Sequence, residues 1–215
     1  MSTVNGGTLL ETLAAAPAKE RDRLCEALLG IATIPEGTER STPDRIGYSP
    51  CSVAEVVRMV FEVPLRQEDV FVDLGSGLGK ACLLVHLLSG ATSIGVEIQE
   101  ELVRKAQESA RVLGLSRVSF VAEDAATADL GEGNVFFLYV PFTGELLQTV
   151  LLKIKAIAQT KPIVVCALGL DLPPSEWLTP RATEAFWLTL YDSHAPRIPI
   201  PQTPVAQRLT EEWRG

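Results

Sequence analysis

The sequence predicts an α/β protein whose sheet is mostly parallel and is covered by helices on both faces. Short apolar runs alternate with amphipathic stretches of helical length through the middle of the chain, as in βαβ units. The first of these runs, Val70–Leu74, ends in a glycine-rich turn that opens the next helix. The chain has 215 residues, which is enough for one sizeable core and too few for two.

The chain is expected to form one domain with two parts, a helical cap over residues 1–66 and a Rossmann-like core over residues 67–215. In the cap, Thr8 and Glu11 have the spacing of a capping box, in which each residue satisfies a backbone N–H of the other. This pattern predicts a helix that begins near Thr8 and runs to about Gly30.

A connecting loop and a second cap helix are expected next. Pro, Gly, Ser and Thr are frequent from residue 33 to 50, which is typical of a loop. Ser52 and Glu55 repeat the capping-box spacing and predict a helix through Phe61. The N-terminus has no basic-then-apolar signal pattern and no apolar run reaches the length of a membrane span, so we expect a cytoplasmic protein.

The core is expected to contain alternating strands and helices that end in a closing hairpin. The predicted strands are Val70–Leu74, Ser93–Glu97, Val118–Ala122, Val135–Val140 and Ile163–Leu168, and the predicted helices are 79–88, 100–113 and 143–158. Ala185–Tyr191 and Val205–Thr210 are joined by a proline-rich linker, which predicts a hairpin of strands six and seven. The expected fold is therefore a Rossmann-like seven-stranded sheet with an antiparallel last strand.

The turn after the first strand is the most specific signal in the chain. Asp73 lies near the strand's end, and glycines follow at alternate positions, 75, 77 and 79. Dinucleotide folds use a longer spacing, and Lys80 stands where their third glycine would be. A carboxylate ahead of the turn would repel a pyrophosphate but suits a ligand with a cationic amino acid end. Lys80 itself is expected to be solvated.

This strand, turn and helix resemble motif I of the Rossmann-fold S-adenosylmethionine methyltransferases. The resemblance implies S-adenosyl-L-methionine as the cofactor. It also implies cofactor contacts from the following residues: Asp73, Gly75, Ser76, Gly77 and Gly79.

Glu97 is the second predicted cofactor residue, with Ile98 beside it. An acid at the end of the second strand accepts hydrogen bonds from the ribose hydroxyl groups. The alternative is a surface acid that favours the N-terminus of the following helix. An acid at this position is compatible with both nicotinamide cofactors and S-adenosylmethionine, whereas the glycine spacing distinguishes between them.

Asp124 and Ala125 follow the third strand, where methyltransferases place an acid against the adenine amino group and the next backbone N–H on the ring. Asp129 is a nearby competitor for this role. A turn-forming Asp124 is the alternative.

Tyr139 and Phe142 are expected to line the methyl-transfer site at the end of the fourth strand. Amino-methylating relatives carry an Asn/Asp-Pro-Pro-Tyr/Phe motif there, and its aromatic ring covers the cationic centre. This chain keeps Pro141 and Phe142 but lacks the Asn or Asp, so methylation of adenine or glutamine amines is not favoured. Simple packing is the alternative for Phe142.

The run DVFVDLGSGLGKACLLV, followed by GVEI, also looks like the non-SET histone-lysine methyltransferase family (disruptor of telomeric silencing) and its bacterial relatives. The resemblance spans Tyr48 to Leu168. It implies that Tyr48, Ser49 and Ser52 form a wall over the methionine end of the cofactor. That family's basic nucleosome-binding tail has no counterpart here, so a chromatin substrate is not implied.

Composition limits the acceptor. The net charge is -8 and no Lys/Arg cluster stands out, so a protein or small-molecule acceptor is expected and nucleic acid is not. The four cysteines lack metal-ligand spacing, and they are expected to be buried thiols with no metal site. The predicted function is methyl transfer from S-adenosylmethionine to N or O of a protein side chain or small molecule. A nicotinamide-dependent oxidoreductase and a non-catalytic cofactor-binding module are the alternatives.

Overall fold

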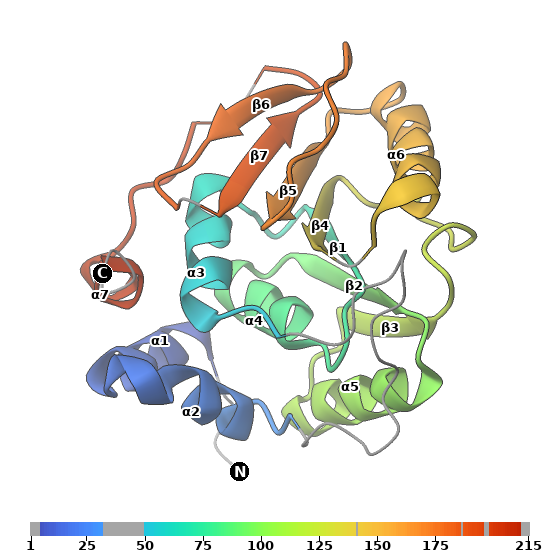
Figure 1. Cartoon of the computed structure of the whole chain (residues 1–215). Helices are drawn as coiled ribbons and strands as arrows, with labels where there is room; N and C mark the ends of the chain where they lie inside the picture. The colour runs from blue at the N-terminus through green and yellow to red at the C-terminus, as the bar shows by residue number, and fades with distance from the viewer. Residues whose placement is uncertain (1–4, 32–49, 141, 186, 196–197, 212–215) are drawn as a thin grey trace.

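A computed structural model describes residues 5–31, 50–140, 142–185, 187–195 and 198–211 (Figure 1). Its centre is a seven-stranded sheet with the order β3-β2-β1-β4-β5-β7-β6. The strands are β1 Val70–Leu74, β2 Thr92–Glu97, β3 Val118–Ala122, β4 Val135–Tyr139, β5 Val164–Leu168, β6 Thr179–Ala182 and β7 Leu188–Asp192. Strands β1 to β5 are parallel, and β7 is antiparallel to both β5 and β6. The predicted fold class, including the antiparallel last strand, is confirmed.

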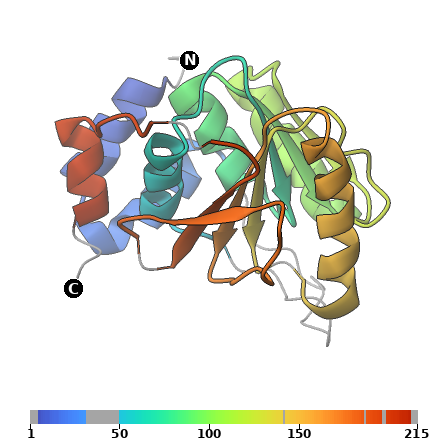
Figure 2. The ribbon, with the colours of Figure 1, turned by 90° about the horizontal axis from the view of Figure 1, so that it is seen from above.

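Helices cover both faces of this sheet, as Figure 2 shows from above. They are α1 Gly6–Ala15, α2 Arg21–Leu28, α3 Val53–Glu62, α4 Lys80–Ser89, α5 Glu100–Leu113, α6 Gly144–Ala158 and α7 Pro204–Glu211, with a short 3-10 turn at Ala18–Glu20. One face carries α3, α4 and α5, with α1, α2 and α7 packed outside them, and the other face carries α6. No helix among the described residues is long and apolar enough to cross a membrane.

Strand side chains alternate between two apolar clusters, which fixes the register of the sheet. On β1, Phe71 points into the cluster under α3 and α4, whereas Val72 and Leu74 point into the cluster under α6. All four cysteines are buried free thiols, as expected from their apolar settings. Because β1 to β4 are parallel, their carboxyl ends meet at one edge of the sheet, and the predicted cofactor residues that follow β1, β2 and β3 lie there.

The predicted helix from Thr8 to Gly30 is wrong, because the chain forms two helices with a break at Pro17. Asn5, not Thr8, caps α1: its side-chain oxygen accepts the Thr8 N–H at 2.9 Å. Ala16 is extended, with φ -82° and ψ 150°, as expected for a residue before proline. The second capping box is confirmed, since Ser52 Oγ accepts the Glu55 N–H at 3.2 Å and Glu55 Oε2 accepts the Ser52 N–H at 2.6 Å.

One of the two predicted segments of the closing hairpin is right, since Ala185–Tyr191 overlaps β7, and the other is wrong. The strands of the hairpin are β6 and β7, and the segment Val205–Thr210 lies in helix α7 instead. Buried Ala206, Leu209 and Thr210 follow a helical period, and Pro204 occupies the first helical position, where its missing N–H costs nothing. Helix α7 packs against α1 and α3, two helices of the N-terminal part of the chain.

Candidate cofactor site

The glycine-rich turn between β1 and α4 folds back onto β2. The backbone N–H groups of Gly75 and Ser76 both donate to the Val96 carbonyl oxygen, at 2.8 and 3.1 Å. Gly75, Gly77 and Gly79 have φ values of +88°, +53° and +81°, in the left-handed region that only glycine enters without strain. The alternate spacing of glycines is therefore the spacing that this backbone path requires.

Gly79 also lacks space for a side chain. A Cβ built there would lie 2.4 Å from the ring of Phe120 on β3 and 3.1 Å from the Ala106 Cβ on α5. Gly95 on β2 is equally restricted, because its Cβ would lie 2.3 Å from the same ring and 2.6 Å from Ser76 Oγ. These close contacts hold the turn against β2 and β3.

Glu97 is buried at the end of β2, and the backbone orients its carboxylate. Its two oxygens accept hydrogen bonds from Gly77 N at 3.0 Å and Gln99 N at 2.9 Å. The carboxylate therefore lies directly beside the glycine-rich turn, as the ribose assignment requires. Ile98 follows it and is 44% exposed, which places an apolar surface next to this acid.

Asp73 is 4% exposed, and burial together with the nearby Glu97 carboxylate raises its pKa to about 8. The Cys82 thiol lies 4.0 Å from Asp73 Oδ2. Asp73 and Ser76 line a small cavity of about 30 Å³, whose other walls are Pro50, Cys51, Gly75, Lys80, Ala81, Phe137 and Tyr139. The buried Ser76 hydroxyl has no hydrogen-bond partner among the described residues.

Asp124 lies in the loop after β3, close to the end of β2, because the Glu123 N–H donates to the Glu97 carbonyl oxygen at 3.1 Å. Its side chain forms a turn in which Asp124 Oδ1 accepts the Ala126 N–H at 2.9 Å. Ala125 is buried beneath this loop. Lys153 of α6 holds the loop by donating to the carbonyl oxygens of Ala125, Ala126 and Ala128. Asp124 therefore has the turn-forming role, and it also lies at the edge of the sheet where the cofactor is expected.

The two predicted acceptor-site residues have different surroundings. Tyr139, at the end of β4, lines the small cavity beside Asp73. Phe142 is buried in the apolar cluster under α6, which favours the packing alternative for this ring. Tyr48 and Ser49 lie outside the described residues, and the Ser52 hydroxyl is engaged in the capping box. Pro50 and Cys51, just before Ser52, line the cavity instead.

Lys80 is not solvated, which corrects the expectation from the sequence. Its side chain is 4% exposed, and its ammonium group forms ion pairs with Asp22 at 3.2 Å and Glu26 at 2.9 Å. Burial lowers the pKa of this amine, but the two carboxylates outweigh burial and raise the pKa above its ordinary value. Asp22 and Glu26 are thus residues near the site that the motif reading missed.

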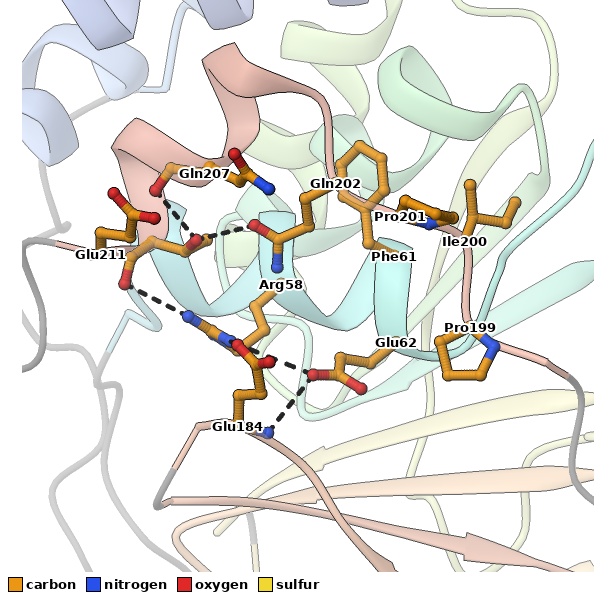
Figure 3. A pocket seen from close by; sticks show the side chains of 11 residues that line it. Arg58, Phe61, Glu62, Glu184, Pro199, Ile200, Pro201, Gln202, Gln207 and Glu211 are labelled. Carbon is orange, nitrogen blue, oxygen red and sulfur yellow. Dashed lines mark hydrogen bonds and ion pairs between the residues drawn. The ribbon is translucent and has the colours of Figure 1, made fainter.

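A larger cavity of about 530 Å³ lies between α3, α7 and the turn that joins β6 and β7 (Figure 3). Its cation, Arg58, is buried and donates to Glu184 Oε2 at 3.1 Å and to the Thr210 carbonyl oxygen at 3.3 Å. The two cavities share no lining residue. Arg58 therefore joins α3, α7 and the hairpin, and this hollow is separate from the cofactor edge.

The residues at the cofactor edge fit S-adenosylmethionine. The cofactor has a cationic amino acid end, a ribose and an adenine, and the edge presents a buried Asp73, a backbone-held Glu97 and an exposed Ile98 in that order across β1 and β2. The unpartnered Ser76 hydroxyl adds a polar group at the amino acid end. A pyrophosphate would instead meet the Glu97 carboxylate and the buried acid Asp73, neither of which offers it a positive charge.

Several known proteins with similar sequences or structures are methyltransferases by name. Residues 65–140 match the family model described as a methyltransferase domain. A phosphoethanolamine N-methyltransferase of Plasmodium falciparum is 30% identical over 82 residues, which cover 38% of this chain and 30% of that protein. A 23S rRNA (uracil(1939)-C(5))-methyltransferase of a Marinomonas species is 45% identical over 58 residues, or 27% of this chain and 13% of that protein. The matches thus cover less than a third of either relative.

A solved structure extends the comparison to most of the chain. The RNA methyltransferase from Salinibacter ruber, in complex with S-adenosyl-L-homocysteine, is 29% identical, with a TM-score of 0.53 over 72% of this chain and 98% of that one. These matches favour the methyltransferase prediction over the oxidoreductase alternative. The family match over residues 65–140 and the structure in complex with S-adenosyl-L-homocysteine therefore support an S-adenosylmethionine-dependent methyltransferase of Rossmann-like fold, with S-adenosylmethionine as the cofactor.

Proposed function

We propose that this chain transfers the methyl group of S-adenosylmethionine to a nitrogen or oxygen atom of a protein side chain or small molecule. The observation that carries this proposal is the pairing of Asp73 and Glu97, two buried acids on adjacent parallel strands with the glycine-rich turn between them. In this arrangement Asp73 on β1 would bind the amino group of the cofactor and Glu97 on β2 would bind its two ribose hydroxyl groups. The two sites are one strand apart.

Each residue at the edge has a defined task in this proposal. When bound, the cofactor supplies an electrophilic methyl group on its sulfonium sulfur. Asp73 would accept hydrogen bonds from the ammonium group, Glu97 from the ribose hydroxyls and Asp124 from the adenine amino group, while Ile98 would cover one face of the base. Gly75, Ser76, Gly77, Gly79 and Ala125 would contact the cofactor as the backbone of the two loops. Tyr139 would form the wall next to the acceptor.

The rate enhancement in this proposal comes from alignment. An acceptor atom held in line with the sulfonium methyl group reacts directly, so no covalent enzyme intermediate is required. The described part of the chain keeps Tyr139 at the end of β4 but buries Phe142, so Tyr139 is the aromatic side chain that we assign to the acceptor site.

A protein or small-molecule acceptor suits the net charge of -8 better than a long phosphate backbone does. The resemblance to the non-SET histone-lysine methyltransferases puts a lysine amine among the protein acceptors to be tested. RNA is a second candidate, because two of the similar proteins are RNA methyltransferases by name. Phosphoethanolamine, the substrate in the name of the third, represents the small molecules.

Transfer of a labelled methyl group tests the proposal and separates the acceptors. The protein is incubated with S-adenosylmethionine carrying a tritiated methyl group and with a cell extract, and the products are then treated with protease or ribonuclease. Label that protease releases supports a protein acceptor, label that ribonuclease releases supports RNA, and label in small solutes supports a metabolite. The Glu97→Ala variant is the control. Absence of transfer above that variant, despite cofactor binding, would favour a non-catalytic cofactor-binding module.

A further inference from the structure

Lys80 is a buried cation at the start of a helix, where the helix dipole disfavours positive charge. Its ammonium group donates to Asp22 Oδ1 and Glu26 Oε1, two carboxylates that lie one turn apart on α2. The lysine side chain is 4% exposed, whereas the side chains of Asp22 and Glu26 are 48% and 34% exposed. The cap helix α2 thus supplies the negative charge that allows a lysine to lie buried beside the glycine-rich turn.

The same carboxylate oxygen of Asp22 has a second partner. Asp22 Oδ1 also accepts the backbone N–H of Val53, the first residue of α3, at 2.8 Å. One oxygen atom on α2 therefore connects the N-terminus of α3 with the N-terminus of α4 through Lys80. We call this set of three residues, Asp22, Glu26 and Lys80, the α2 clasp.

Residues at both helix N-termini that the clasp connects line the small cavity at the cofactor edge. Pro50 and Cys51, which lead into α3, form one part of its wall, and Lys80 and Ala81, which begin α4, form another. Neither Asp22 nor Glu26 lines the cavity. A displacement of α2 would therefore change the separation of these walls without removing any group that contacts the cofactor.

We propose that the α2 clasp positions the two walls around the amino acid end of S-adenosylmethionine, and that Lys80 and Asp22 are positioning residues for this part of the cofactor. This inference rests on the proposed cofactor orientation, in which Asp73 receives the ammonium group. It makes the N-terminal cap a working part of the cofactor site. By reciprocity, the cofactor's amino acid end would stabilise the docking of α2.

The variant that tests the clasp is Lys80→Met. Methionine fills a similar apolar volume without a charge, and the half-exposed carboxylates of Asp22 and Glu26 stay hydrated, so this change is compatible with folding. Asp22→Asn is the second variant, because an asparagine oxygen still accepts the Val53 N–H while the ion pair to Lys80 is weakened. If Lys80→Met does not fold, the Asp22→Asn variant still tests the proposal.

The measurement compares two ligands by calorimetric titration. S-adenosylhomocysteine carries the amino acid end, and 5′-methylthioadenosine has the same nucleoside without it. The clasp predicts that Lys80→Met weakens S-adenosylhomocysteine binding by roughly tenfold or more, with a smaller loss for Asp22→Asn, and that both variants bind 5′-methylthioadenosine like the wild type. A purely structural role would weaken both ligands equally.

A third variant controls for a general loss of stability. Arg181→Met removes an ion pair between Arg181 Nε and Asp192 Oδ2, 2.9 Å apart on β6 and β7 at one edge of the sheet, and a hydrogen bond to the carbonyl oxygen of Glu62, the last residue of α3. Unchanged S-adenosylhomocysteine affinity in this variant, beside a selective loss in Lys80→Met, supports the clasp. Equal losses for both ligands, or no loss in either clasp variant, would overturn it. Failure of the wild type to bind S-adenosylhomocysteine would instead contradict the proposed function.

Discussion

Asp73 and Glu97 are buried on adjacent parallel strands, and their carboxyl groups have different hydrogen-bond environments. Glu97 accepts two backbone N–H groups, from Gly77 and Gln99. The Asp73 carboxyl accepts a long hydrogen bond from the Cys82 thiol at 4.0 Å, and burial together with Glu97 raises the pKa of Asp73 to about 8. Glu97 is thus organised before the cofactor binds, whereas Asp73 needs a cationic ligand to become a stable carboxylate.

Cofactor binding should therefore release a proton near neutral pH. Below pH 8 Asp73 is mostly protonated in the free protein, and an ammonium group beside it favours the carboxylate and lowers its pKa. The affinity for S-adenosylhomocysteine should rise from pH 6 to pH 8, by up to roughly tenfold per pH unit. Calorimetry in buffers of different ionisation enthalpy measures the released proton. The affinity of 5′-methylthioadenosine should stay flat over the same range, and a flat profile for both ligands would contradict the role of Asp73.

Asp73→Asn should stabilise the protein while it weakens cofactor binding. An acid with a pKa of about 8 when folded and 3.8 when unfolded binds more protons in the folded state, so it makes the free energy of unfolding fall as pH rises between these values. Asparagine removes this penalty, and at pH 8 we expect the free energy of unfolding to rise by several kcal/mol, up to about 5 kcal/mol, with little change at pH 4. Thermal unfolding of the wild type and of Asp73→Asn at pH 8 and at pH 4 measures this difference in stability. A variant less stable than the wild type at pH 8 would refute the burial argument.

Asp124→Ala should reduce base discrimination. If Asp124 accepts the adenine amino group, the wild type should bind S-adenosylhomocysteine more tightly than the inosine analogue, whose ring carries an oxygen at that position. The variant should lose roughly three- to tenfold of this preference, the value of one hydrogen bond. Asp129→Ala is the matched control, since Asp129 Oδ1 accepts the Gly131 N–H in a similar turn. Equal preference in the wild type and Asp124→Ala would leave Asp124 with its turn-forming role alone.

Gly79→Ala should destabilise the protein by roughly 2–4 kcal/mol, because it adds a left-handed backbone conformation and a clash with the Phe120 ring. Gly114 has a similar φ of +70° but nothing within 4 Å of the added Cβ, so Gly114→Ala should cost only about 1 kcal/mol. Denaturant unfolding of the two variants measures the difference. Equal destabilisation would show that the Phe120 contact adjusts without cost.

The parts of the fold that follow from periodicity could be predicted, and those that depend on distant contacts could not. Strands β1 and β3 and helix α5 begin and end at the predicted residues, because their apolar patterns are clear and are ended by glycine or polar residues. Strand β6, with a central proline and one half-buried position, carries no such pattern. The sequence predicts a strand at Val205–Thr210 because Pro204 resembles the other prolines of the linker, whereas in the structure Pro204 begins helix α7.

The candidate site shows the same division. The positions of Asp73 and Glu97 follow from strand ends and glycine spacing, both of which are local. The burial of Lys80 depends on Asp22 and Glu26, more than fifty residues earlier in the chain, and no local pattern connects them. The sequence does contain two acids four residues apart, Asp22 and Glu26, and such a pair could hold a lysine. Many surface helices carry acids at this spacing, so the pair alone does not predict the ion pairs to Lys80.

Calorimetric titration with S-adenosylhomocysteine tests the central claim most directly. The wild type and Glu100→Ala, which removes an exposed acid from the first turn of α5, should bind with micromolar affinity and should not bind NAD. Glu97→Ala should lose on the order of 1.5–3 kcal/mol of binding free energy, as expected for a hydrogen bond to a charged group. Binding of NAD without the thioether, or unchanged affinity in Glu97→Ala, would contradict the cofactor site described here.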